Sequence, residues 1–188
     1  SLELAKKHLH IFSTVGYHPH EATDFDAEVV KYLAREKKVV AVGEIGLDFF
    51  RNLAPYSVQR EVFSNQVLLA MDYDLPIIVH DRDAHQECFK ILKQANAKDV
   101  VFHCFSGDLI FAQQVLDEGW MISFTGSITY PNAKLDDVIR MMPLDQFMIE
   151  TDCPYLAPEP FRGRRNWSGY LNYIIDRIAD IKGIEYNE

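Results

Sequence analysis

The chain has 188 residues, 48% of them hydrophobic, and a formal net charge of −9 at pH 7. This composition predicts one soluble globular domain with a sizeable core and argues against a protein that coats long nucleic acid by releasing counterions. No apolar run approaches the roughly 20 residues that span a bilayer and the first residues do not resemble a signal segment, so we expect no membrane contact and a cytoplasmic protein.

Strands and helices are predicted to alternate along the whole chain. The helical spacing of Leu2, Ala5 and Leu9, with no capping turn before it, predicts that the chain begins partway through a helix. Apolar, mostly β-branched runs predict six strands, over residues 11–16, 39–45, 76–80, 100–104, 119–125 and 146–151. Apolar positions at helical spacing predict helices after them: one capped by Thr23 or Asp24, one over 58–73, one near 84–95, one after Asp108, one near 135–142, and a last one capped by Ser168. This alternation is typical of a parallel sheet with right-handed crossovers, as in a (β/α)₈ barrel.

Chemically active side chains follow four of these strands. Glu44, His80, His103 and Asp152 each stand at or just after the end of an apolar run. If the strands are parallel, these ends converge at the carboxyl edge of one sheet, where two imidazoles and two carboxylates form a site suited to zinc, manganese or magnesium. A single histidine or glutamate at a strand end is more often a hydrogen-bonded structural residue, but four in chain order favour a metal site. Cys88, Cys104 and Cys153 do not have the spacing of a zinc site, and we interpret them as reduced thiols.

Six sequence blocks resemble those of a known family. They are GYHPHEA at 16–22, VGEIGLDF at 42–49, LPIIVHDRDA at 75–84, HCFSG at 103–107, ISFTGSIT at 122–129 and ETDCPYLAPEPFRGRRN at 150–166. Together they resemble the TatD family of metal-dependent deoxyribonucleases, which are TIM barrels of the amidohydrolase type with one or two divalent metals.

The resemblance implies roles for individual residues. Glu44 resembles a carboxylate that bridges the metals, and His80 and His103 resemble imidazole ligands of one of them. Asp152 resembles the aspartate that binds the other metal and orients or deprotonates the attacking water, so Asp152 and Glu44 are the expected catalytic residues. The expected cofactors are one or two divalent ions per chain, Mg, Mn or Zn, and the expected substrate is DNA at strand ends.

Basic and imidazole side chains near these ligands are candidates for binding the substrate. His18 and Arg82 resemble loop positions that face phosphate, although Arg82 stands between Asp81 and Asp83 and could instead form a surface ion pair. Arg162, Arg164 and Arg165 form the one dense basic cluster. A run of charge is usually a solvated face, but this one directly follows Asp152, and we interpret it as a phosphate-binding rim.

The chain departs from the family pattern at its start. The resemblance implies a first strand that ends in a His-x-His pair of metal ligands, and no such strand precedes residue 11. His8 and His10 match only in their letters, because they precede a strand instead of following one. We therefore expect residues 1–188 to be a single, incomplete TatD-like TIM-barrel domain of about six β/α units, strands three to eight, without the family's last helix.

Two alternative functions remain at this level. The same site could hydrolyse an ester or amide bond, as in D-aminoacyl-tRNA, because activated water serves both reactions and the shape of the pocket decides between them. Alternatively, a chain without the His-x-His ligands would be catalytically silent, with weak or single-metal occupancy and a tendency to associate through its open sheet edges.

Overall fold

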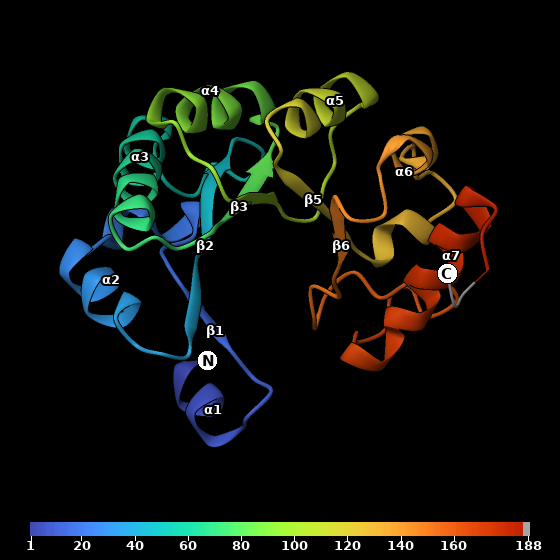
Figure 1. Ribbon diagram of the computed structural model, residues 1–188, viewed down its shortest axis with the longest axis horizontal. Coiled ribbons are helices and arrows are strands. Elements are labelled where there is room, and N and C mark those ends of the chain that lie inside the picture. Colours follow the sequence, from blue (N-terminus) through green and yellow to red (C-terminus); the bar gives the residue numbers. More distant parts are fainter. Residues whose placement is uncertain (186–188) are drawn as a thin grey trace. The chain divides into compact units, whose positions relative to one another are not determined.

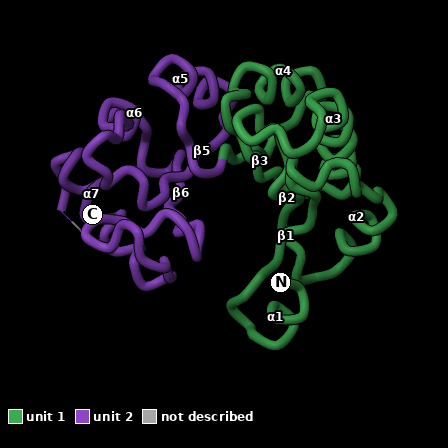
Figure 2. The backbone as a smooth tube through the Cα atoms, turned by 180° about the vertical axis from the view of Figure 1, so that it is seen from behind, with its two compact units in different colours: residues 1–102 green, residues 103–188 purple. Residues whose placement is uncertain are grey.

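The computed structural model describes residues 1–185, and the chain divides into two compact units, residues 1–102 and 103–188 (Figures 1 and 2). In both units parallel strands alternate with helices, as predicted. Within residues 1–185, no helix has the length and apolarity that crossing a membrane requires. The prediction of one domain over 1–188 stays a prediction.

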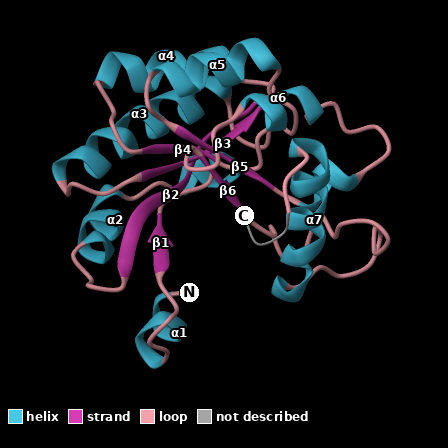
Figure 3. Ribbon diagram, turned by 45° about the vertical axis from the view of Figure 1, so that its right-hand side comes forward, coloured by secondary structure: helices cyan, strands magenta, loops and turns pink. Residues whose placement is uncertain are grey.

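The first unit is a parallel four-stranded sheet with helices between its strands. Its strand order is β1-β2-β3-β4, and β1 and β2 run side by side in Figure 3. The strands are β1 (Ser13–Val15), β2 (Val39–Asp48), β3 (Ile77–Arg82) and β4 (Val100–Phe102). The helices are α1 (Leu2–Lys7), the 3₁₀ segment η1 (Pro19–Asp24), α2 (Ala27–Ala34), α3 (Tyr56–Asp72) and α4 (His85–Ala95).

Helix α3 forms much of the core of this unit. It packs against β2, and α4 packs against β3 beside it (Figure 1). The apolar positions predicted for this helix are buried: Val62, Phe63, Val67, Leu69 and Ala70. The same helix also buries two amide side chains, Gln59 and Gln66, seven residues apart and therefore on one face. Both reach backbone atoms next to the candidate site described below.

The second unit has two parallel strands and three α-helices among the described residues. Strand β5 (Met121–Phe124) pairs with β6 (Phe147–Ile149). Helix α5 packs against β5, and α7 packs against β6 and α6. The helical elements are α5 (Leu109–Asp117), the 3₁₀ segment η2 (Gly126–Thr129), α6 (Asp136–Met141), the 3₁₀ segment η3 (Ser168–Tyr170) and α7 (Leu171–Lys182).

The predicted helix caps are partly wrong. Helix α2 is capped by Asp26, which accepts a hydrogen bond from the amide of Glu28 at 2.9 Å, and not by Thr23 or Asp24, which end the preceding 3₁₀ segment. Ser168 begins η3 and is not the cap of α7. A short 3₁₀ turn precedes each of these helices, and the apolar spacing alone did not distinguish it from the first helical turn.

Strand ends also differ from the prediction. Strand β2 continues to Asp48, beyond the predicted end at residue 45, whereas β4 ends at Phe102 and β6 at Ile149. Cys104 and Asp152 have φ angles of 47° and 57°, which an extended strand does not accommodate. His103 and Asp152 therefore stand on the connections that follow their strands.

Candidate metal centre

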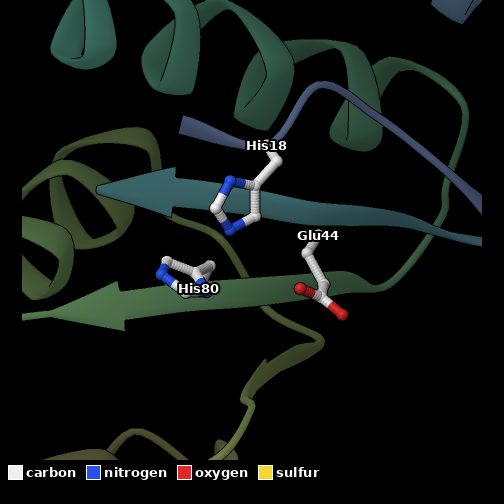
Figure 4. Close-up of side chains that lie close together, drawn as sticks. All are labelled: His18, Glu44 and His80. Carbon is white, nitrogen blue, oxygen red and sulfur yellow. The ribbon is translucent and has the colours of Figure 1, made fainter. Parts of the chain in front are cut away.

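Three side chains of the first unit form a cluster that could hold a metal ion. They are His18, after β1, Glu44, on β2, and His80, on β3, and Figure 4 shows them side by side. Their nearest ligand atoms all lie within 4.8 Å of one another. Two imidazole nitrogens and a carboxylate oxygen are donors that suit a divalent ion such as zinc or manganese. The cluster thus combines predicted metal ligands Glu44 and His80 with His18, predicted to bind substrate.

Buried hydrogen bonds position His18. Gln66 holds the backbone of the preceding residue: its Oε1 accepts from the amide of Tyr17 at 2.7 Å, and its Nε2 donates to the carbonyl of Tyr17 at 3.0 Å. Gln66 itself is fully buried. The His18 ring is held in turn by the amide of His20, which donates to Nδ1 at 3.2 Å. This chain of contacts fixes both the backbone and the ring of His18.

Glu44 lies where the register of β2 against β3 is irregular. The pairing shifts between Val42 and Ile45, and the Glu44 side chain is exposed while its neighbours on both sides are buried. Such a local irregularity redirects a side chain, which explains how a charged residue can occupy the middle of an otherwise buried strand.

Two glycines let β2 approach β3 closely at this point. A Cβ atom on Gly43 would lie 2.6 Å from Cβ of Ile78. A Cβ atom on Gly46, whose φ is 148°, would lie 1.9 Å from the carbonyl oxygen of His80. The Gly-Glu-Ile-Gly pattern is therefore explained by the close contact that brings Glu44 and His80 together.

A buried carboxylate supports the cluster from the end of β2. Asp48 is fully buried, and its Oδ2 lies 2.7 Å from Nε2 of His20 and 3.4 Å from Nε2 of His80. Burial raises the pKa of Asp48, but hydrogen bonds from the Arg51 amide and His20, together with the charge of His80, outweigh it and lower that pKa below its ordinary value. An ionised Asp48 orients the His20 ring through their hydrogen bond and places a negative charge beside Nε2 of His80 without a hydrogen bond to it.

A similar pair lies in the second unit. Nδ1 of His103 is 3.1 Å from Oε1 of Glu150, which also accepts from Ser123 Oγ and from the amide of Cys104, both at 2.7 Å. Burial raises the pKa of Glu150, yet the bonds from His103, Ser123 and Cys104 outweigh it and lower that pKa. With Nδ1 donating to a carboxylate, Nε2 of His103 keeps the lone pair that a metal requires.

The predicted ligands are thus distributed over both units. Glu44 and His80 lie in the first unit, next to His18, and His103 and Asp152 lie in the second. The convergence of all four at one site stays a prediction, as do the catalytic roles of Glu44 and Asp152.

The predicted phosphate-binding arginines make no ion pairs in the described part of the chain. Arg82 does not pair with Asp81, which binds Nδ1 of His85 at 2.6 Å, and its guanidinium lies 4.1 Å from the ring centroid of Phe50. Arg162 lies 4.3 Å from the ring centroid of Tyr130. Contacts with an aromatic ring leave the hydrogen-bonding edge of a guanidinium accessible to an anion.

Four supporting residues were missed from the sequence: His20, Asp48, Gln66 and Glu150. His20 and Asp48 lie inside the quoted blocks GYHPHEA and VGEIGLDF, so the signal was present but was not assigned a role. Gln66 carried no signal, because a glutamine within a helix usually faces solvent.

Comparison with known proteins identifies the family. Residues 1–188 match the family model described as TatD related DNase. The Bacillus subtilis protein named uncharacterized metal-dependent hydrolase YabD is 39% identical over 100% of this chain and 76% of its own length. A protein of Erwinia amylovora named 3'-5' ssDNA/RNA exonuclease TatD is 36% identical over 100% of this chain and 77% of its own length.

A solved structure agrees with these matches. The crystal structure of YjjV, a TatD homologue from Escherichia coli K12, superimposes with a TM-score of 0.90 at 31% identity, covering 99% of this chain and 74% of that one. With parallel strands alternating with helices, this match makes the fold a partial (β/α) barrel, as predicted. The chain belongs to the TatD family of metal-dependent hydrolases.

Proposed function

We propose that the chain hydrolyses phosphodiester bonds at the ends of DNA strands with the help of divalent metal. The observation that carries this proposal is the pair of predicted metal ligands Glu44 and His80 with His18 beside them as a hydrogen-bond donor. Arg82 follows His80 by two residues, and within residues 1–185 no carboxylate lies at ion-pair distance from it. A relative named as a 3'-5' exonuclease, 36% identical, supports the same reaction class.

Glu44, His80, His103 and Asp152 would hold the metal. Their mixed nitrogen and oxygen donors fit zinc, manganese or magnesium, and one or two ions are consistent with four such ligands. When bound there, a divalent ion supplies Lewis acidity that makes water a stronger acid and neutralises charge on the phosphoryl group. Asp152 would orient the attacking water or accept its proton.

His18 is assigned to the substrate phosphate by its hydrogen bonding. Because Nδ1 accepts from the amide of His20, we assign the hydrogen of the neutral ring to Nε2. A protonated Nε2 donates to a phosphate oxygen but cannot bind a metal ion. Binding of metal by His18 through Nε2 would require the Nδ1 tautomer and loss of the bond from His20.

Arg82 would bind the same phosphate group from the end of β3. It follows His80 by two residues on β3, and its stacking on Phe50 restricts the guanidinium before substrate arrives. A guanidinium that is already ordered loses less entropy on binding and forms a paired contact with phosphate oxygens.

The test is a metal-dependent assay with matched variants. Glu44→Gln and Asp152→Asn remove one charge each from the predicted ligands and should lower hydrolysis of DNA by at least about 100-fold, since loss of a residue that only supports a ligand already costs about 10-fold to 100-fold. Asp137→Asn removes the same charge from an exposed residue of α6 and should leave hydrolysis unchanged. Activity that persists in both ligand variants would contradict the proposal.

The substrate assay separates phosphodiester from ester chemistry. Single-stranded DNA and an aminoacyl ester are compared with the same enzyme and the same Mn²⁺ or Mg²⁺. Hydrolysis of the ester alone would reject the nuclease and favour the alternative of D-aminoacyl-tRNA hydrolysis. Hydrolysis of neither, with metal bound, would indicate a catalytically silent chain.

A further inference from the structure

The loop between Asp152 and α7 exposes two large aromatic side chains beside three arginines. Tyr155 is 71% exposed and Trp167 is 60% exposed. Arg162, Arg164 and Arg165 are all exposed, and within residues 1–185 no carboxylate lies at ion-pair distance from them. In a chain with a net charge of −9, three uncompensated guanidinium groups on one loop point to an anionic ligand.

The Trp167 ring is held in place although most of it faces solvent. It lies over the backbone of Gly169, where an added Cβ would come within 2.5 Å of the indole. Its edge contacts Tyr170, with ring centroids 5.7 Å apart, and Tyr170 stacks on Phe161 at 4.3 Å and 3°. The indole is therefore ordered, but it fills no core.

Buried hydrogen bonds connect Trp167 to the segment that carries Asp152. Asn166 is only 2% exposed, and its Nδ2 donates to the carbonyls of Thr151 and Tyr155, both at 2.7 Å. Its Oδ1 accepts from the amide of Trp167 at 2.8 Å. The Asn166 side chain thus links Thr151, the residue before Asp152, to Trp167 at the surface of the same loop.

We propose that Trp167 is a stacking platform for an unpaired base of a nucleic acid strand, with Arg162, Arg164 and Arg165 binding the adjoining phosphates. An exposed, ordered indole among arginines is the arrangement by which proteins bind single strands, because every base offers a face for stacking. A paired base inside a duplex has no free face. The platform would therefore favour unpaired strands, and this inference rests on the proposed nuclease function.

The test measures binding without hydrolysis. In the presence of a chelator, a short oligodeoxythymidylate is titrated into the protein. The control ligand is an abasic strand of deoxyribose phosphates of equal length, which carries the same charge but no bases. Trp167 is one of two tryptophans and the other, Trp120, is buried, with 2% exposure. Stacking should quench the Trp167 fluorescence, and the abasic chain should not.

Matched variants identify the residue. Trp167→Ala should weaken binding of the oligodeoxythymidylate by about 5-fold to 150-fold, the range for stacking of one base on an aromatic side chain, and leave binding of the abasic chain unchanged. Trp167→Phe should restore most of the affinity without the quenching. Tyr32→Ala removes an aromatic residue of α2 that is 68% exposed, and it should change neither affinity.

Two outcomes would overturn the inference. One is equal affinity of the wild type and Trp167→Ala for the oligodeoxythymidylate. The other is a change in sedimentation of Trp167→Ala without a change in affinity, which would make the ring a contact between protein copies. Because metal is absent, failure of the platform and failure of the nuclease are separate results: stacking without any hydrolysis rejects only the nuclease.

Discussion

Replacement of Asp48 by asparagine tests whether the carboxylate behind the imidazole cluster controls metal binding. Asp48 is fully buried and accepts from the Arg51 amide at 2.7 Å and from His20 at 2.7 Å, with His80 at 3.4 Å. In Asp48→Asn, the new side chain keeps an oxygen for the Arg51 amide but presents a neutral amide group to the two rings. The substitution therefore removes the charge and preserves the volume.

Two magnitudes follow from these contacts. Loss of the charge-assisted hydrogen bond to His20 should lower the free energy of unfolding by about 1.5–3 kcal/mol. Loss of the carboxylate charge beside His80 should weaken metal binding by about 10-fold to 100-fold. Asp48 is not a member of the cluster itself, so this second effect would be transmitted through its charge.

The assay combines urea unfolding of the metal-free chain with calorimetric titration of Mn²⁺ or Zn²⁺ into the folded chain. Asp26→Asn is the control, because it removes an exposed carboxylate of the same unit while asparagine caps a helix as well as aspartate does. If Asp48→Asn loses stability but binds metal as tightly as the wild type, Asp48 is a structural residue only, and its proposed role is refuted.

Three further predictions concern other contacts. Gly46→Ala should lower the free energy of unfolding by about 4 kcal/mol or more, or prevent folding, because the new Cβ would lie 1.9 Å from the carbonyl oxygen of His80. The control is Gly163→Ala, where φ is 84° and no atom lies within 4 Å of the new Cβ: thermal unfolding should show a loss of only about 1–2 kcal/mol. The hydrogen bond and charge of Arg60 outweigh burial and lower the pKa of Glu87 below its ordinary 4.5, so this pair contributes above pH 4.5 and its contribution is lost as pH falls through the lowered pKa. Glu87→Gln should thus lower the free energy of unfolding by at most about 1 kcal/mol at pH 7 and by progressively less as the pH falls below 4.5. An equal loss at pH 7 and in acid, measured by urea unfolding, would contradict this. Asn166→Ala removes three hydrogen bonds of a buried amide and should lower the free energy of unfolding by about 2–4 kcal/mol, and an unchanged urea midpoint would refute this role.

The order of the elements could be predicted from the sequence because it depends on local apolar spacing. In the runs Ile77–Val79 and Val100–Phe102 the first and third residues are buried and the middle one is partly buried. The helical positions around Phe63 and Val67 alternate with polar residues at the period of a helix. Glu44 and His80 could be predicted in the same way, because each is a polar residue at or just after the end of an apolar run.

The supporting contacts could not be predicted because they depend on how far strands extend and on which polar residues are buried. The apolar run predicts a strand that ends at residue 45, which leaves Asp48 outside it, whereas Asp48 lies within β2 beside His80. Gln66 lies on the buried face of α3, near Phe63 and Ala70, and only the tertiary structure shows that its amide is bonded to the backbone of Tyr17.

The two histidine–carboxylate pairs bear on the proposed metal site from independent parts of the chain. Asp48 lies opposite Nε2 of His80, and Glu150 lies opposite Nδ1 of His103. Glu150 accepts the hydrogen of Nδ1 of His103, so this ring would present Nε2 to a metal ion. Asp48, by contrast, is an ion-pair neighbour of Nε2 of His80 at 3.4 Å without a hydrogen bond to it. The pKa values of Asp48 and Glu150 are lowered although burial alone would raise them, so both carboxyls are ionised. A histidine that only fills an apolar core does not require an ionised carboxylate beside it. An ionised carboxylate beside each ring therefore supports assigning His80 and His103 as metal ligands, and His18, whose Nδ1 accepts from a backbone amide, as the group that donates a hydrogen bond to phosphate.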